Sequence, residues 1–186
     1  MNVVILVRTM LLILLQPSLN HAVVDLETEI TLQRIEQTTG FSILKTNLRV
    51  TKFNRTCAVI NGTVDILADL DNRYSMKPAY SRIGNNQFNE YPMKIAENAL
   101  CCYVNDTYRL FQDMLRNTTN LPMVGPDGLC PVPSGHYWFK QVKNLMNNVP
   151  PMVPEGYWRL TFIISGPRDV VEIQVFVILS KGFFGG

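Results

Sequence analysis

The residues that could do chemistry in this 186-residue chain are few, and their spacing forms no catalytic set. His136 is the one histidine beyond the N-terminal segment, and Ser134 precedes it by two positions. A hydrolase needs a nucleophile, a base and a group that orients the base, but the sequence has no GxSxG elbow to present a serine. We therefore interpret His136 as a residue at the start of a strand and expect no catalytic residues.

Carboxylates offer the next chemistry to consider, because a glycosidase needs only two of them. Asp65, Asp69 and Asp71 lie close together, but strand alternation puts Asp65 and Asp69 on a polar face that solvent would cover. The sequence has no phosphate loop or dinucleotide motif. Without a CxxC pair, a single histidine cannot complete a usual metal site. We expect a protein that is not an enzyme and has no cofactor and no bound metal.

Composition and net charge limit the type of fold and the classes of partner that the chain can have. Apolar residues make up 47% of the chain, charged residues 17%, and the formal net charge is +2. This apolar fraction is enough for a core and too high for intrinsic disorder. A charge so close to neutrality argues against a nucleic-acid partner, which would require a basic excess.

The N-terminal segment has the pattern of an export signal. Arg8 precedes the apolar run Met10–Leu15 and a polar stretch, and Ala22 offers a small residue for cleavage. The alternative is a retained anchor, but the run is shorter than the roughly 20 residues a spanning helix needs. We predict a signal peptide over residues 1–22, a secreted extracellular protein and no stable membrane insertion.

Four cysteines follow this segment: Cys57, Cys101, Cys102 and Cys130. An even number in a secreted chain predicts a disulfide framework, and the residues alone leave three pairings open. In a strand, Cys101 and Cys102 would point to opposite faces, so each would pair elsewhere, one with Cys130 and one with Cys57.

Four Asn-x-Thr sequons support the same compartment. They begin at Asn54, Asn61, Asn105 and Asn117. A glycan must lie at the surface, so each sequon predicts an exposed asparagine.

Short apolar segments separated by turn signals predict an antiparallel β-sandwich of about eight strands. Asn61-Gly62 reads as a two-residue hairpin turn. The predicted strands are Phe41–Val50, Lys52–Ile60, Thr63–Leu70, Met76–Ile83, Phe88–Ala96, Leu100–Val104, His136–Leu145, Gly156–Ser165 and Asp169–Ser180. Residues 23–40 fit a helix or a strand equally well and are assigned as a polar lead-in, which leaves residues 41–182 as the domain.

One segment departs from the strand pattern. Tyr108, Phe111, Met114 and Leu115 recur at helical spacing, which predicts an amphipathic helix over Tyr103–Asn117. A long loop rich in proline and glycine, Thr119–Gly135, follows it. Aromatic residues and methionines are concentrated in the last third of the chain, where they could line an apolar ligand cavity. Ordinary core packing is the alternative for each of them.

Several sequence pieces carry a resemblance to a known family. They are Cys57-Ala-Val-Ile-Asn-Gly-Thr63, Ala99-Leu-Cys101-Cys-Tyr-Val104, Cys130-Pro131 followed by Gly135-His-Tyr137, and Pro150-Pro-Met-Val-Pro154-Glu-Gly156-Tyr-Trp-Arg-Leu160. In this order and spacing, the stretch from Phe41 to Ser180 resembles secreted insect proteins of the CheB type. These look related to the ML lipid-recognition domains, such as the ganglioside activator protein.

The resemblance implies an immunoglobulin-like β-cup whose two sheets splay apart around an apolar cavity. Related proteins bind lipids or other hydrophobic molecules and catalyse nothing. The resemblance also implies a Cys101–Cys130 disulfide, with Cys57–Cys102 left as the second pair. The family often has an earlier cysteine where Thr46 stands, and Cys102 has no usual counterpart.

We therefore expect a secreted glycoprotein that holds or presents a lipid or semiochemical, in chemosensory fluid and with an extracellular receptor as a partner. The expected cavity walls are Val64, Ile66, Trp158, Leu160, Phe162, Val175 and Val177, and the helix residues Phe111, Met114 and Leu115 would close its mouth. The alternative is an extracellular protein–protein interaction module with a packed core. Some hundreds of Å³ between the sheets would favour a ligand cup, and the absence of any void larger than a water would favour the module.

Overall fold

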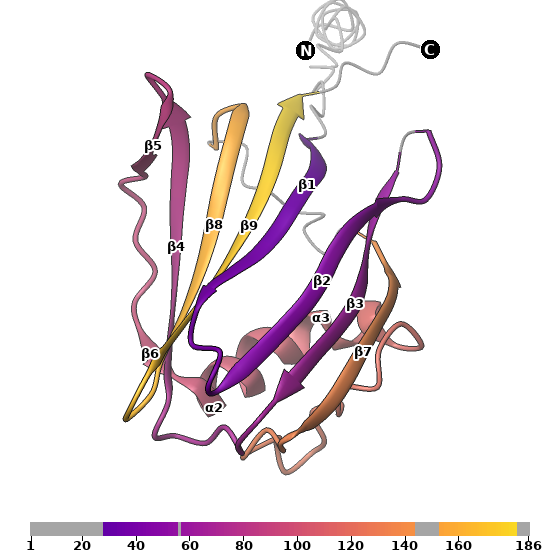
Figure 1. Ribbon diagram of the computed structural model, residues 1–186, viewed down its shortest axis with the longest axis vertical. Helices are drawn as coiled ribbons and strands as arrows, with labels where there is room; N and C mark the ends of the chain where they lie inside the picture. The colour runs from indigo at the N-terminus through magenta and orange to yellow at the C-terminus, as the bar shows by residue number, and fades with distance from the viewer. Residues whose placement is uncertain (1–27, 56, 144–152, 182–186) are drawn as a thin grey trace, which may run out of the picture.

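The computed structural model describes residues 28–55, 57–143 and 153–181 (Figure 1). Within these ranges the chain forms two antiparallel sheets that face each other, with a helical segment near their lower ends in this view. The all-β sandwich with a short helix is therefore confirmed. The predicted signal peptide, residues 1–22, lies outside the described residues.

The larger sheet has the strand order β1-β9-β8-β4-β5, with β6 paired to β4. Its strands are β1 (Thr28–Thr39), β4 (Ser75–Gly84), β5 (Gln87–Glu90), β6 (Asn98–Ala99), β8 (Gly156–Ser165) and β9 (Val170–Lys181). The predicted final hairpin is confirmed as β8 and β9, in which Trp158 lies opposite Val177 and Leu160 opposite Val175. Alternate apolar residues on both strands turn toward the smaller sheet and bury one face of the hairpin.

The smaller sheet has the order β2-β3-β7. Its strands are β2 (Leu44–Lys52), β3 (Ala58–Ile66) and β7 (Gly135–Val142). The predicted turn at Asn61-Gly62 is wrong, because β3 runs straight through both residues. Gly62 has a φ of 136°, and a Cβ there would lie 2.0 Å from the Asn47 carbonyl oxygen, so glycine permits close approach of two strands instead of a turn.

The polar lead-in expected over residues 23–40 is also wrong where the structure describes it. Residues 28–39 form β1, which pairs along β9 from Thr28↔Lys181 to Thr39↔Glu172. Leu32 is buried, while most other residues of β1 are half-buried or exposed. An edge strand that buries one face only needs few apolar residues, which explains its polar composition.

The helical segment consists of α2 (Leu100–Tyr103), the π-helical turn η1 (Val104–Tyr108) and α3 (Arg109–Leu115). The predicted helix is confirmed, but it begins at Leu100, so the strand expected over Leu100–Val104 is wrong. No helix in the described ranges is long and apolar enough to cross a membrane.

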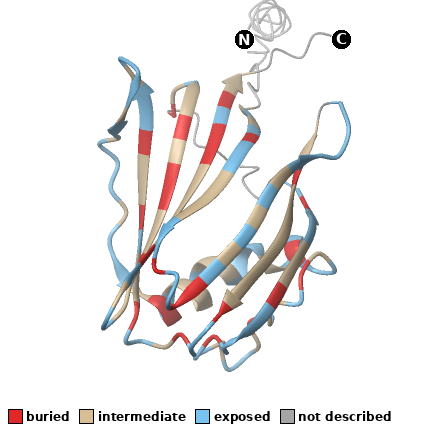
Figure 2. Cartoon of the chain, viewed as in Figure 1, coloured by how far each residue is buried: buried red, intermediate tan, exposed pale blue. Residues whose placement is uncertain are grey.

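Buried side chains form two clusters between the sheets, and buried positions recur along β8 and β9 (Figure 2). One cluster includes Ile66, Leu100, Tyr137 and Val171 and joins both sheets to the helical segment. The other is built around Trp158 and includes Leu160, Val177 and Leu179. The candidate site borders the first cluster.

Candidate functional site

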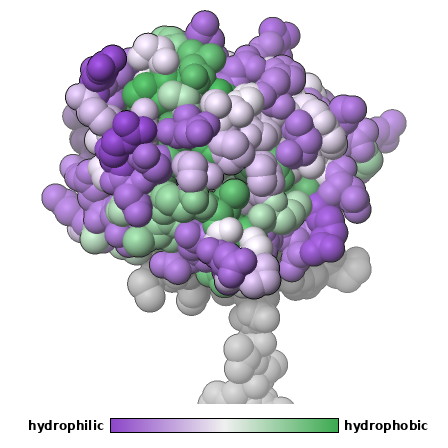
Figure 3. Space-filling view, turned by 90° about the horizontal axis from the view of Figure 1, so that it is seen from below, coloured by the Kyte–Doolittle hydropathy of each residue, from purple (hydrophilic) through white to green (hydrophobic). Residues whose placement is uncertain are grey.

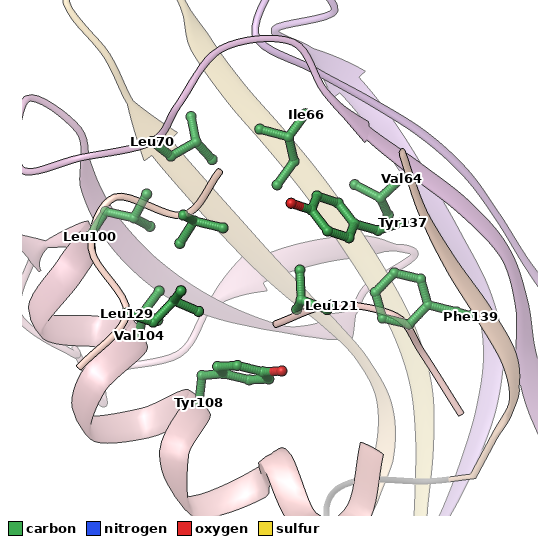
Figure 4. A pocket seen from close by; sticks show the side chains of 11 residues that line it. Val64, Ile66, Leu70, Leu100, Val104, Tyr108, Leu121, Leu129, Tyr137 and Phe139 are labelled. Atoms are coloured by element: carbon green, nitrogen blue, oxygen red, sulfur yellow. The ribbon is translucent and has the colours of Figure 1, made fainter. Parts of the chain in front are cut away.

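An apolar cavity of about 170 Å³ lies between the inner face of the smaller sheet and the helical segment (Figure 4). Eleven residues line it: Val64 and Ile66 from β3, Tyr137 and Phe139 from β7, Leu100, Val104 and Tyr108 from the helical segment, and Leu70, Leu121, Leu129 and Val132 from loops. Hydrophobic surface is visible among hydrophilic residues in the view from below (Figure 3).

Strand register and helix spacing explain why these side chains meet. Val64 lies opposite Tyr137 in the β3–β7 ladder, so both turn to the same face of the sheet. On the helical side, Leu100, Val104 and Tyr108 follow one another at intervals of four residues and share one face. The cavity is thus bounded by one sheet and one helix face, and loops form part of its remaining wall.

A disulfide fastens the helix to the loop that faces it. Cys101 and Cys130 are bonded across a sequence separation of 29, with a Cα–Cα distance of 5.5 Å. Their neighbours Leu100 and Leu129 both line the cavity. The Cys101–Cys130 pair implied by the family resemblance is therefore confirmed, and it holds two walls of the cavity together.

The second expected pair, Cys57–Cys102, is wrong, because both thiols are free within the described chain. The expectation placed Cys101 and Cys102 on opposite faces of a strand. In the observed helix successive side chains are about 100° apart, so Cys101 is buried toward Cys130 while Cys102 is exposed.

Hydrogen bonds from four residues of the helical segment attach it to the loop. The Tyr108 hydroxyl donates to the Pro122 carbonyl (3.1 Å), and the Arg109 guanidinium donates to the Gly125 carbonyl (2.9 Å). The Val124 amide donates to the Gln112 side chain and the Leu129 amide to the Asn105 side chain, each over 2.7 Å. These bonds keep the loop, which has no regular structure of its own, over the cavity.

The two hydroxyl groups of the cavity lining are already used by the protein. Tyr108 donates to the Pro122 carbonyl, and Tyr137 donates to the Pro133 carbonyl over 2.7 Å. Burial raises the pKa of both phenols, so both stay neutral donors at ordinary pH. Among the described lining residues, the surface left for a guest is therefore hydrocarbon.

We expect the fold to lose stability at alkaline pH because of these tyrosines. A phenol whose pKa is raised on folding contributes stability that is fully present below its unfolded value, about 10, and is lost as pH rises through the folded value. Chemical unfolding at pH 8 and pH 11 should give a lower free energy at pH 11, with a smaller loss in Tyr108→Phe. Equal losses in the two proteins would show that Tyr108 is not involved.

The seven expected wall residues lie in two different regions. Val64 and Ile66 line the cavity as predicted. Trp158, Leu160 and Val177 are buried in the second cluster, and Phe162 and Val175 pack against it. These five face the space between the sheets but are not among the residues that line this cavity.

The three residues expected at the mouth do not line the cavity either. Phe111 and Met114 are 38% and 42% exposed, whereas Leu115 is buried at 6%. At about 100° per residue, Leu115 returns to within roughly 20° of Tyr108, while Met114 lies roughly 120° away. The face pointing inward is therefore that of Tyr108 and Leu115.

Sequence reasoning missed nine lining residues, and part of the signal was present. Leu100, Val104 and Tyr108 show the four-residue spacing of a helix face, which the assumed strand over Leu100–Val104 concealed. Tyr137 and Phe139 alternate as strand residues do. Leu70, Leu121, Leu129 and Val132 lie in irregular segments, where no periodicity marks which side chain turns inward.

Asp65 and His136 lie on the other side of the smaller sheet, and Asp69 lies in the loop that follows β3. His136 Nδ1 lies 2.5 Å from an Asp65 carboxylate oxygen, and both side chains are exposed. Asp69 accepts a hydrogen bond from the Ser134 amide (2.7 Å), and that contact lowers its pKa. In the ladder Asp65 and His136 alternate with the inward pair Val64 and Tyr137, so the side chains of Asp65 and His136 point away from the cavity.

The four sequon asparagines differ in their surroundings. Asn54 and Asn117 are exposed. The Asn61 side chain donates to Thr51 and accepts from the Gln141 amide, over 2.7 and 2.8 Å. The Asn105 side chain accepts from Leu129 and lies against Gly128. The side chains of Asn61 and Asn105 thus form hydrogen bonds that stabilise the fold.

We predict that Asn117 is glycosylated and that Asn61 and Asn105 are not, because a glycan would displace the contacts of both. Glycopeptide mass spectrometry of protein from an animal-cell host measures each site. Asn105→Asp keeps the acceptor for Leu129 and should leave the melting temperature almost unchanged, whereas Asn105→Ala should cost about 1–3 kcal/mol. A glycan found on Asn105 would contradict this assignment.

Comparison with known proteins finds a match for part of the chain. No curated protein matches the chain. Residues 73–160 match the model of a family described as a protein of unknown function, DUF1091. The matched stretch runs from just before β4 into β8 and contains the helical segment, the disulfide and most of the cavity lining. Over these residues the chain is similar to the DUF1091 family.

Proposed function

We propose that this chain is a secreted, non-catalytic binding protein that holds a small hydrophobic molecule. The observation that carries the proposal is the cavity of about 170 Å³, whose described lining is apolar or aromatic and whose two hydroxyl groups are bonded to backbone carbonyls. A guest would gain roughly 25 cal/mol for each Å² of apolar surface that it buries.

Cavity size narrows the class of guest. A dry apolar cavity of about 150 Å³ is large enough for benzene, and sites for drug-sized molecules hold roughly 300–1,000 Å³. The proposed guest portion is therefore a single ring or a short hydrocarbon segment. A lipid or semiochemical with a longer chain would place only one end in this cavity.

The proposal includes an extracellular location for the protein. It is supported by the export-signal pattern, the four sequons and the disulfide between Cys101 and Cys130. The resemblance to CheB-type insect proteins and to ML lipid-recognition domains extends it to a carrier in chemosensory fluid that presents its guest to a receptor.

The second candidate function is an extracellular protein–protein interaction module. It is favoured by the exposed apolar side chains of α3, where Leu110 is 77% exposed beside Phe111 and Met114. In that case the cavity would be a packing defect without a resident guest.

Titration with fluorescence-displacing alkyl compounds of increasing chain length tests the proposal. Each added methylene that enters the cavity should tighten binding about fourfold, since its burial contributes roughly 0.8 kcal/mol. Affinity should level off once the chain outgrows the space. If no member of the series binds saturably, the interaction module becomes the better assignment.

A further inference from the structure

Basic residues are concentrated on the smaller sheet. Residues 44–66 and 135–143, which hold its three strands, contain six of the 17 basic residues and one of the 15 acidic residues. The six are Lys45, Arg49, Lys52, Arg55, Lys140 and Lys143. The rest of the chain therefore has fewer basic than acidic residues, and a total charge near neutrality conceals a strongly basic sheet.

Strand alternation places three of these cations on the outer face, opposite the cavity. Along β2, Lys45 and Arg49 are exposed, while Leu44 is buried and Leu48 half-buried. Lys140 is exposed and its ammonium lies 4.7 Å from the ring centre of Trp138, an outer-face neighbour of His136. Lys45 and Arg49 are four residues apart, which separates them by roughly 13 Å along the strand. We call this surface, with Lys45, Arg49 and Lys140, the basic face.

In the part of the chain that the structure describes, the cations of the basic face have no carboxylate partners. None of the six basic residues forms an ion pair within the described residues. The single acid of the sheet, Asp65, is hydrogen-bonded to His136 and lies opposite Lys45 in the β2–β3 ladder, so it offsets one of the three positive charges. The basic face therefore keeps an excess of positive charge, which attracts anions and raises their local concentration.

The polar side chains that lie between the cations indicate which kind of polyanion the basic face would bind. Asn47 and Thr63 lie opposite each other on the outer face, so a hydroxyl and an amide stand between Lys45 and Arg49. The large exposed apolar residue in this part of the described chain is Phe53, beyond the end of β2. A bilayer would favour several such residues for insertion, whereas a hydroxyl-rich chain can bond to amides and hydroxyls.

We propose that the basic face binds a sulfated polysaccharide, whose sulfate groups pair with Lys45, Arg49 and Lys140. This rests on the extracellular part of the proposed function and is independent of the cavity and its guest. The bonds of Asn61 to Thr51 and Gln141 support it, because an unglycosylated Asn61 leaves this face uncovered.

The test compares two triple variants of the full secreted chain on immobilised heparin. K45Q/R49Q/K140Q removes three charges from the basic face, and K77Q/K94Q/R168Q removes three exposed charges outside the smaller sheet. Retention of the wild type and the second variant at about 0.15 M salt is expected, with affinity at least about tenfold lower for the first variant. Equal weakening of both variants, or of neither, would overturn the proposal.

Two further measurements distinguish a polysaccharide site from a folding defect and from a membrane site. Asn47→Glu adds one acid to the exposed face and keeps all three cations, and it should also weaken retention even if the triple variant folds poorly. Vesicles containing phosphatidylserine test a membrane as the partner. Binding to such vesicles that is tighter than binding to heparin, and equally sensitive to the first triple variant, would assign the face to bilayers and contradict a polysaccharide site.

Discussion

Leu121→Trp is expected to abolish guest binding while the sandwich stays folded. Leu121 is a half-buried lining residue whose side chain projects into the cavity (Figure 4). An indole there would occupy the space that a guest needs, since protein interiors leave no room for both. We expect at least about tenfold weaker binding of the alkyl series, with overpacking costing roughly 1–3 kcal/mol of stability.

Leu110→Trp is the matched control, because it makes the same substitution on a side chain that is 77% exposed. It should bind like the wild type. If Leu121→Trp also binds like the wild type, the guest does not occupy this cavity. If Leu110→Trp alone weakens binding, the hydrophobic contact is on the outer surface of α3 and the interaction module is favoured.

Loss of the Cys101–Cys130 disulfide should have the next largest effect. The bond closes a loop with a sequence separation of 29, for which chain entropy predicts about 3–4 kcal/mol of stabilisation. In the variant with both cysteines changed to serine, the melting temperature should fall and guest binding should weaken more than stability alone explains. The reason is that Leu100 and Leu129 would no longer be held on opposite walls.

Cys102→Ser provides the control for that experiment, because Cys102 is an exposed free thiol one position from the bonded cysteine. Its melting temperature and affinity should match the wild type. A loss in Cys102→Ser comparable to that in the double variant would mean that this thiol is paired in the folded protein. An unchanged double variant would show that the hydrogen bonds of the loop suffice to hold the cavity.

The sandwich could be predicted because the alternation of apolar residues marks the buried face of most strands. In β8, Trp158 and Leu160 recur at every second position with Arg159 between them, and such a period of two in the apolar residues predicts a strand with one buried face. β1 was missed for the converse reason, since an edge strand with one buried face shows too few apolar residues. The prediction of a turn at Asn61-Gly62 was wrong because this dipeptide has a strong local preference for turns. The feature that requires Gly62 is the close approach of Asn47, a tertiary contact that the local sequence does not show.

The cavity could be predicted only in part, because its walls come from segments that sequence periodicity describes badly. Val64 and Ile66 follow from strand alternation. Leu129 and Val132 are turned inward by a disulfide and by the paired backbone bonds between Leu70 and Val132. No spacing in the sequence records such constraints. The charge of the basic face was hidden for another reason, since a net charge of +2 averages over the whole chain.

Methyl NMR of the isotope-labelled protein during titration with toluene tests most directly whether the cavity holds an apolar guest. We predict saturable shifts in the methyl signals of Val64, Leu100, Val104, Leu121 and Leu129, all of which line the cavity. The methyls of Leu110 and Val170, which are exposed, should not move. Shifts confined to exposed methyls, or no saturable shift at the lining residues, would contradict a binding cavity.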